Sequence, residues 1–141
     1  MENLYYRFKN VSVEQFATLS DNLLDSLPMD YETQFSFQFS KDERVLVSRS
    51  EISLFQGKEL KMKSIFDCAF EIKDESIVEI TQEDGSIIFP RSVLIQLASL
   101  NYGTLRGIII ERTKGTVFSS IFLPPLVIGE IIKEDLVIFV E

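Results

Sequence analysis

Hydrophobic and polar residues alternate along the stretch 31–39, and they do so strictly from residue 34 onward. The apolar positions of this alternation are Phe35, Phe37 and Phe39. A period of two is typical of a β-strand that buries one face. Residues 44–55 and 60–73 follow with strand-like composition, after short polar turns at 40–43 and 56–59. Three strands joined by two short turns predict an antiparallel meander.

The chain before this meander predicts one more strand. Residues 4–13 are rich in aromatic and β-branched side chains, which favour extended structure. Residues 14–27 instead place apolar side chains near helical spacing and end before Pro28, so we expect a short helix or an ordered connector there. After the meander, the acidic connection 74–86 predicts a short strand or turn at 77–80.

A long helix is predicted from Pro90 to Lys114. Pro90 suits the first helical position, and apolar residues return at helical spacing behind it. These residues are Val93, Leu94, Leu97 and Leu105. Such a helix would be about 37 Å long at 1.5 Å per residue, unless a glycine near its middle bends it. Residues 117–132 are again apolar, and the pattern leaves residues 133–141 undecided between helix and strand.

Small residues recur at every fourth position within this helix. They are Ser99, Gly103 and Gly107. Each glycine disfavours a helix interior by about 1 kcal/mol relative to alanine, so this placement needs a reason. Small residues four apart form a flat strip that lets a second backbone approach closely. The strip predicts a helix-mediated interface of a homo-oligomer or tight packing against the sheet; the alternative is that Gly103 ends or bends the helix.

Composition limits the functions that remain. The 141 residues are 45% hydrophobic and 26% charged, which is typical of one globular domain spanning residues 1–141. The net charge of −8 argues against nucleic acid as a partner. The longest apolar stretches are shorter than the ~20 residues that span a bilayer, and the start of the chain has no secretory signal pattern. Together with a lone cysteine, Cys68, these features predict a cytoplasmic protein without a membrane span.

The chain contains no histidine. Ser-His-Asp and Cys-His catalysis and imidazole zinc sites are therefore excluded for this chain, and no phosphate-binding glycine loop is present in the sequence. An enzyme built on carboxylates, lysine or tyrosine stays open as an alternative, but we expect no catalytic residue, no metal and no cofactor. Cys68 falls on the apolar face of its strand, which favours a buried structural thiol over a reactive one.

Two apolar features are candidates for a binding surface. The first is the phenylalanine stripe of residues 31–39, which is either core or the lining of a groove. The second is the uncharged run 117–129, which is either a buried loop or an exposed surface. The candidate binding residues in these two segments are Phe35, Phe37, Phe39, Phe118, Ile121, Phe122 and Leu123.

The order of these elements resembles the SecB family of export chaperones. In that family a strand ending in roughly Leu-Phe-Pro opens the long helix, and a proline-containing apolar stretch follows it. Residues 88–90 (Ile-Phe-Pro) and 123–125 (Leu-Pro-Pro) are similar, and the resemblance covers residues 30–132. It implies an α+β fold, with a four-stranded antiparallel sheet and a long helix packed on one face. It also implies a tetramer in which this helix lies between two sheet layers.

The resemblance further implies an ATP-independent chaperone or adaptor that holds unfolded or export-bound polypeptides in apolar grooves, without a cofactor. Family members dock on the translocase motor through acidic residues on the outer sheet face and a hairpin turn. The comparable turn here is Gly57-Lys58-Glu59, and its lysine argues against docking on that motor. Divergent relatives serve other clients, toxin–antitoxin pairs among them.

Two alternative functions stay open at this point. One is a scaffolding protein whose apolar segments only form an oligomer interface. The other is a small-molecule binding protein with a pocket lined by Phe35, Phe37 and Phe39.

Overall fold

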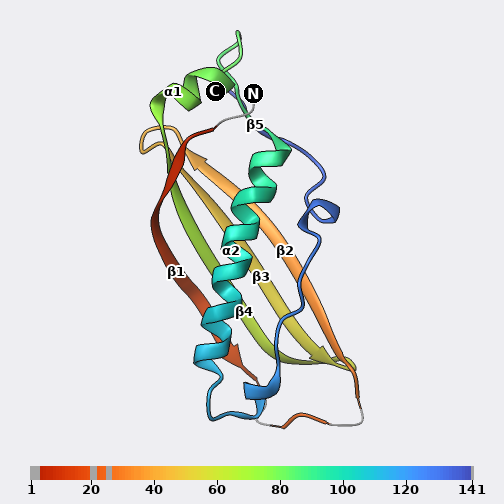
Figure 1. The fold of residues 1–141 in the computed structure, drawn as a ribbon. Helices are drawn as coiled ribbons and strands as arrows, with labels where there is room; N and C mark the ends of the chain where they lie inside the picture. The colour runs from red at the N-terminus through yellow and green to blue at the C-terminus, as the bar shows by residue number, and fades with distance from the viewer. Residues whose placement is uncertain (1–3, 20–21, 25–26, 141) are drawn as a thin grey trace.

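The computed structural model describes residues 4–19, 22–24 and 27–140, and its largest element is a twisted antiparallel sheet (Figure 1). The four strands are β1 (Tyr6–Thr18), β2 (Met29–Ser40), β3 (Val45–Gln56) and β4 (Glu59–Ile72). Their order across the sheet is β1-β4-β3-β2, so β1 and β2 form its two edges. A long helix, α2 (Arg91–Arg112), crosses one face (Figure 1). The predicted α+β fold is confirmed.

The predicted meander of β2, β3 and β4 is also confirmed. β2 pairs with β3 residue by residue along its whole length. Alternate residues of β3 and β4 face the helix layer and are fully buried; they include Leu46, Ile52, Phe66 and Phe70. The turn between β3 and β4 is tight because Gly57 takes a φ of +60°, a left-handed conformation that favours glycine. The core therefore lies between the sheet and α2.

Strand β1 is longer than the sequence pattern predicts. The strand expected at residues 4–13 is confirmed from Tyr6 onward, but the extended structure continues to Thr18. The expected helix is therefore wrong for residues 14–18. The rest of that segment is irregular at residues 19, 22–24 and 27, and residues 20–21 and 25–26 lie outside the described part of the chain.

β1 contains two bulges, and the second lies at the start of the expected helix. The pairing register against β4 shifts at Lys9 and again at Glu14. Each bulge adds one residue between side chains that face the helix layer. Val13 and Phe16 therefore lie on the same face although they are three residues apart, which is also the spacing of a helix. Pairing with β4 decides the structure here.

The acidic connection after the meander forms a short helix, α1 (Asp74–Ile80), and not the strand or turn expected at 77–80. Asp74 and Glu75 occupy its first turn, where the partial positive charge of a helix N-terminus favours carboxylates. Two of its residues, four apart, are buried. Packing of that face, which the acidic composition hides, stabilises the helix.

Helix α2 confirms the prediction of a long helix that begins after Pro90. It runs through Gly103 and Gly107, so neither glycine ends it. Its buried residues are Val93, Leu94, Leu97, Ala98, Asn101, Tyr102, Leu105 and Ile109. Among the described residues it is the helix that is long and apolar enough, by length and composition, to cross a membrane. In this fold its apolar side packs on β3 and β4, which accounts for that composition.

The segment after α2 runs back along the molecule beside β2 as mostly irregular chain (Figure 1, blue). It contains two 3₁₀ turns, η1 (Val117–Ser120) and η2 (Ile128–Glu130). The undecided residues 133–141 include a short strand, β6 (Leu136–Ile138), which pairs antiparallel with β5 (Ile87–Phe89). This two-stranded sheet fixes the end of the segment near the start of α2.

Cys68 lies on the buried face of β4, as the alternation predicts. Burial raises the pKa of its thiol from an ordinary value of 9.0 to about 11, and the neighbouring Asp67 carboxylate adds to the rise. The thiol is therefore protonated and inaccessible in the folded protein at neutral pH.

Replacing Cys68 by alanine is expected to lower the free energy of unfolding by about 1–2 kcal/mol through lost contacts. In the wild type, stability should fall as the pH rises from 9.0 to about 11, because the unfolded thiol ionises there while the folded thiol keeps its proton. The alanine variant should lack this part of the pH dependence. Denaturant unfolding over that pH range measures both effects. Rapid labelling of the native thiol at neutral pH would contradict the buried placement.

Candidate functional site

The phenylalanine stripe of β2 faces the helix layer, but because β2 is an edge strand the stripe is only half-buried. The ring of Phe35 meets that of Tyr102 in α2, with centroids 6.3 Å apart. The ring of Phe39 meets that of Phe89 in β5 at 4.9 Å. Phe37, between them in the sequence, lines an open groove together with Phe35. The stripe is therefore both part of the core and part of a groove wall.

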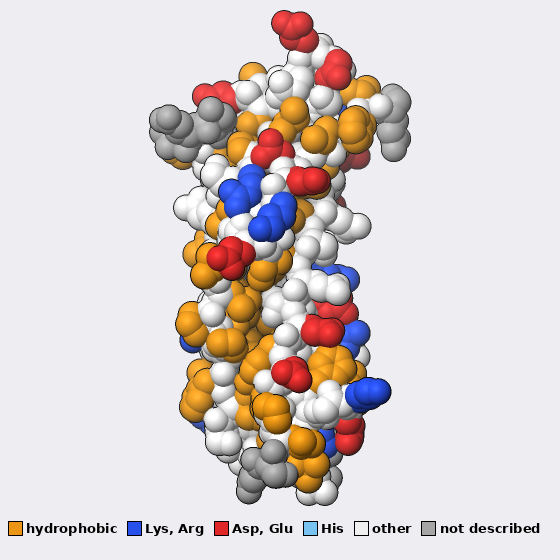
Figure 2. Space-filling view, turned by 90° about the vertical axis from the view of Figure 1, so that its right-hand side faces the viewer, with side chains coloured by type: hydrophobic (Ala, Val, Ile, Leu, Met, Phe, Trp, Pro, Cys, Tyr) orange, Lys and Arg blue, Asp and Glu red, His pale blue; other side chains and the backbone are white. Residues whose placement is uncertain are grey.

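This groove, called the β2 groove below, has a volume of about 280 Å³ and lies between β2 and the C-terminal segment. It is lined by Phe35, Phe37, Leu94, Ile131, Ile132, Lys133, Glu134, Asp135 and Leu136. Aromatic and aliphatic side chains form most of its wall, and the charged residues 133–135 are exposed. Figure 2 looks onto this side of the molecule and shows a broad vertical band of hydrophobic side chains, with charged ones gathered above its middle.

Arg91, the first residue of α2, holds the far wall of the β2 groove in place. Its guanidinium donates hydrogen bonds to the backbone carbonyls of Ile132, at 2.7 Å, and Gly129. Its backbone N–H donates to the carboxylate of Asp135 at 2.6 Å. That bond satisfies one of the free N–H groups at the helix N-terminus. One residue thus ties the C-terminal segment to the helix layer.

A second hollow, of about 440 Å³, adjoins the β2 groove. It is lined by Phe37, Gln38, Phe39, Ser40, Glu43, Val45, Val47 and Ile138. Successive residues of a strand point to opposite faces of the sheet, so this hollow reaches both faces at the edge of β2. Phe37 lines both spaces, and together they follow the edge over residues 35–40.

The residues predicted to bind in the run 117–129 divide into two groups. The buried ones are Phe118, Ile121 and Leu123. Phe122, by contrast, is 63% exposed. The Tyr102 hydroxyl donates a hydrogen bond to the carbonyl of Pro124 at 2.5 Å and holds this run against α2. The run is mainly a packed loop. A binding role for its three buried side chains stays a prediction, and the surface proposed below does not include them because they are inaccessible.

The hydrophobic pattern of the sequence does not indicate which aliphatic residues outside β2 line the groove. They are Leu94, Ile131, Ile132 and Leu136. A signal is present, since residues 131–132 and 136–138 are apolar on either side of the charged residues 133–135. The pattern does not indicate which surface these residues meet, because that depends on the path of the chain after α2.

The small-residue strip of α2 faces away from the sheet. Ser99, Gly103 and Gly107 are exposed, and a methyl group on either glycine would meet no atom within 4 Å apart from the adjoining residues and backbone of its own helix. Tight packing of the strip against this chain's own sheet is therefore a wrong prediction. An interface with another copy stays a prediction. Leu100 and Ile110 on the same helix are also exposed.

The outer face of the sheet carries paired charges. Three of its acidic residues each have a basic partner on a neighbouring strand: Glu71 with Arg7, Asp67 with Arg49, and Glu51 with Lys63. These pairs offset part of the acidic charge on this face. Within the described ranges there is also no group of three or more acidic or cysteine residues that could hold a metal ion.

Comparison with solved structures places this arrangement among known folds. The chain is similar to the SecB-like chaperone Rv1957 of Mycobacterium tuberculosis, solved in complex with a ChAD peptide from the Rv1956 HigA1 antitoxin. The TM-score is 0.52 and the sequence identity 12%, and the match covers 86% of this chain and 90% of that one. No family model matches the sequence. No curated protein matches it either. The likeness is therefore one of fold, and the fold is SecB-like.

Proposed function

We propose that this protein is a divergent SecB-like chaperone or adaptor that binds unfolded or precursor polypeptides without ATP. The β2 groove carries the proposal, because it is an open apolar channel beside an edge strand. The SecB-like neighbour, which was solved with a peptide bound, supports the same role.

Binding in such a groove follows from the burial of apolar surface. Apolar side chains of a client contribute about 25 cal/mol for each Å² removed from water, before the cost of ordering the client. The exposed charges of residues 133–135 can interact with polar groups beside the buried side chains. This binding needs no cofactor and no catalytic group. We therefore propose that the protein is non-enzymatic and that it acts in the cytoplasm.

The same proposal includes a homo-oligomer, and the family resemblance supports a tetramer. Exposed apolar residues on α2 and β1 support it; they are Phe8, Val11, Leu100 and Ile110. The strip of Ser99, Gly103 and Gly107 gives α2 a flat side on which another copy can pack closely. β1 and β2 are opposite edges of the sheet, so assembly through β1 and α2 leaves the β2 groove open to clients.

The protein should slow the aggregation of a reduced, unfolded test protein at a near-stoichiometric ratio without nucleotide. Phe37→Ser should raise the concentration required by about tenfold, because it removes an aromatic ring that lines both hollows. Phe139→Ser is the matched control, since Phe139 is 76% exposed and lines neither hollow. Light scattering measures the protection, and circular dichroism checks that both variants fold.

Unchanged scattering at a large molar excess of the wild-type protein would contradict the chaperone function. An oligomer that gives no protection and binds no apolar dye would favour the scaffolding alternative, in which the exposed residues of α2 serve assembly alone. Native mass, measured with and without the unfolded test protein, separates these two functions.

A further inference from the structure

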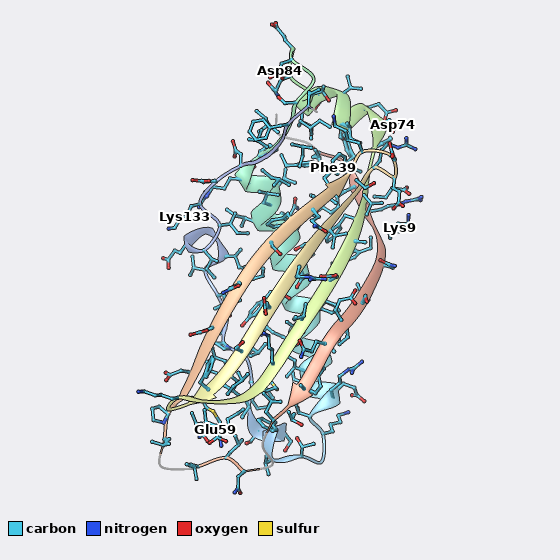
Figure 3. The ribbon with its side chains drawn as sticks, turned by 180° about the vertical axis from the view of Figure 1, so that it is seen from behind. Lys9, Phe39, Glu59, Asp74, Asp84 and Lys133 are labelled. Atoms are coloured by element: carbon cyan, nitrogen blue, oxygen red, sulfur yellow. The ribbon has the colours of Figure 1, made fainter. Side chains whose placement is uncertain are left out.

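A separate hollow lies at the α1 end of the sheet. It has a volume of about 440 Å³ and is formed by the end of β2, the turn that joins β2 to β3, one side of α1 and the connection to β5. Figure 3 labels two of its residues, Phe39 and Asp74, at this end of the molecule, while Glu59 lies at the other end. Among the described residues this hollow, called the α1 pocket below, shares no lining residue with the β2 groove. Its volume is within the range of small-molecule pockets, about 300–1,000 Å³.

Apolar side chains form much of the lining of the α1 pocket. Ile87 is buried, and Phe39 and Ile77 are half-buried. Val78 also lines the pocket, yet it is 73% exposed. An aliphatic ligand in the pocket would cover Val78, and the area removed from water would favour binding. The lining is therefore suited to a flexible alkyl chain.

The charged lining of the α1 pocket has the opposite sign to the protein as a whole. The chain has 14 basic and 22 acidic residues, whereas the pocket is lined by two basic residues, Lys41 and Arg44, and one acidic residue, Asp74. Of the two other acids in the same turn, Glu43 lines the second hollow instead, and Asp42 lines neither. Arg44 Nε lies 2.7 Å from an oxygen of Asp74, so these two charges balance. The positive charge of Lys41 is left over, which favours a monovalent anion in the pocket.

Arg44 has a strained backbone. Its φ is +56°, and the other described residues with a positive φ are glycines, at positions 57, 85 and 115. A side chain in this left-handed conformation crowds its own backbone, so glycine is favoured. The ion pair with Asp74 does not explain the arginine, because the two side chains are 52% and 69% exposed and an exposed pair adds little to stability. Strain of this kind is typical of functional sites, and here it places a guanidinium at the α1 pocket.

We propose that the α1 pocket binds a medium-chain fatty acid as its carboxylate anion. The carboxylate pairs with Lys41 and with the terminal nitrogens of Arg44, and the alkyl chain covers Val78. Arginine has five N–H donors, so pairing with Asp74 through Nε leaves others for a second carboxylate. A carboxylate balances the single net charge of the lining, whereas a phosphate monoester carries nearly two negative charges. This site is independent of the proposed chaperone function.

Isothermal titration calorimetry of the full chain, with fatty acids below their micelle concentrations, tests the site. Hexanoate, octanoate and decanoate form the series. Each added pair of methylene groups should strengthen binding by about tenfold while the chain still fits the pocket, and longer chains should gain nothing more. Decanol and decyltrimethylammonium have a chain of the same length with a neutral or a positive head group. Both should bind at least about tenfold more weakly than decanoate, because neither pairs with the two basic residues.

Substitutions at Arg44 and Lys41 separate ligand binding from folding. Arg44→Gly removes the guanidinium and relieves the backbone strain, so it should weaken decanoate binding by about tenfold while the thermal midpoint stays the same or rises. Lys41→Gln should weaken decanoate binding by a similar factor without affecting decanol. Lys58→Gln is the matched control, because it makes the same change of charge in an exposed turn at the other end of the sheet. Its affinity for decanoate should equal that of the wild type.

Methyl NMR locates the ligand. Decanoate should shift the signals of Ile77, Val78 and Ile87, which line the α1 pocket. The signals of Leu94 and Ile132, in the β2 groove, should not change. Shifts confined to Leu94 and Ile132 would assign the ligand to that groove and overturn the inference.

Four other results would also overturn the inference. The first is the absence of saturable binding for every chain length. The second is equal affinity for decanol and decanoate, which would mean that the basic residues play no part. The third is an Arg44→Gly variant with unchanged affinity, which would make the arginine purely structural. The fourth is a peptide with a free C-terminal leucine that binds more tightly than decanoate, which would make the pocket a polypeptide site. The aggregation assay measures the proposed chaperone function separately, so either hypothesis can fail without the other.

Discussion

Replacing Asn101 by alanine is expected to lower the free energy of unfolding by about 3 kcal/mol. Asn101 is fully buried on α2, and its side-chain amide donates to the backbone carbonyls of Ser48 in β3, at 2.7 Å, and Phe66 in β4, at 3.1 Å. The variant removes both bonds and leaves a small cavity under the helix. The thermal midpoint should fall by on the order of 10 °C for a domain of this size. Denaturant and thermal unfolding measure the change.

Ser64→Ala is the matched control for this prediction. Ser64 is equally buried on β4, but its hydroxyl oxygen has no hydrogen-bond partner in the described structure. Removing an unpartnered buried hydroxyl should leave stability unchanged or raise it by up to about 1 kcal/mol. If Asn101→Ala proves no more destabilising than Ser64→Ala, the two amide bonds do not hold α2 on the sheet.

The position of α2 matters for the binding site as well as for stability. Tyr102, the next residue, contacts Phe35 in the wall of the β2 groove and donates to the Pro124 carbonyl. Asn101 therefore fixes the helix whose side chains support both walls of the groove. A folded Asn101→Ala protein should accordingly bind unfolded clients more weakly than the wild type does.

In the proposed homo-oligomer, replacing Gly103 by leucine is expected to break the assembly while leaving the single chain intact. Apart from the adjoining residues and backbone of its own helix, a methyl group at this position meets no atom within 4 Å in the single chain, so the fold accommodates the larger side chain. Leucine also favours the helix over glycine by up to about 1 kcal/mol. In a close helix-mediated interface the same side chain overpacks, which costs about 1–3 kcal/mol. The native mass should fall at micromolar concentration while the circular dichroism stays near native.

A graded series sharpens this test. Gly103→Ala adds a single methyl group, so it should stabilise the helix with a smaller effect on assembly. Light scattering or sedimentation of the wild type and both variants gives the order of masses. A wild-type protein that is already monomeric at high concentration, or a leucine variant of unchanged mass, would rule out the strip of Ser99, Gly103 and Gly107 as an interface.

Local pattern alone predicts the meander and the long helix. The two-residue alternation in β2, β3 and β4 and the helical spacing after Pro90 each lie within one continuous stretch of chain. Each of these elements buries one face against a single surface of the protein, so its hydrophobic periodicity stays regular along its length. The glycines at 103 and 107 do not interrupt the helix, because they occupy its open side, where they displace no buried contact.

Local pattern misleads where tertiary pairing alters the spacing. The bulge at Glu14 places Val13 and Phe16, three residues apart, on one face, and this spacing coincides with the start of the helical pattern at 14–27. The error at α1 has a different cause. Its acidic residues are typical of a solvent-exposed connection, and only the burial of one face in the folded chain stabilises a helix there. Both errors concern short segments whose structure depends on residues far away in the chain.

For the same reason, only one of the two walls of the candidate site can be predicted from the sequence. The stripe of Phe35, Phe37 and Phe39 identifies one wall of the β2 groove from its alternation. The opposite wall comes from residues 131–136, about a hundred positions later in the chain. Its location depends on the bonds of Arg91 and on the pairing of β5 with β6, neither of which has a local signature.

Periodicity and composition thus determined which stretches are strands and helix, which faces are apolar, and that histidine-dependent chemistry is absent from this chain. The tertiary structure decided which apolar residues are accessible. Phe118, Ile121 and Leu123 are as apolar as Phe122, yet the loop packs the first three into the core and leaves Phe122 exposed. The sequence alone does not decide whether the strip of Ser99, Gly103 and Gly107 faces the sheet or the solvent. The placement of α2 on the sheet decides it. Accessibility depends on the path of the whole chain, because each surface is buried by residues distant in the sequence.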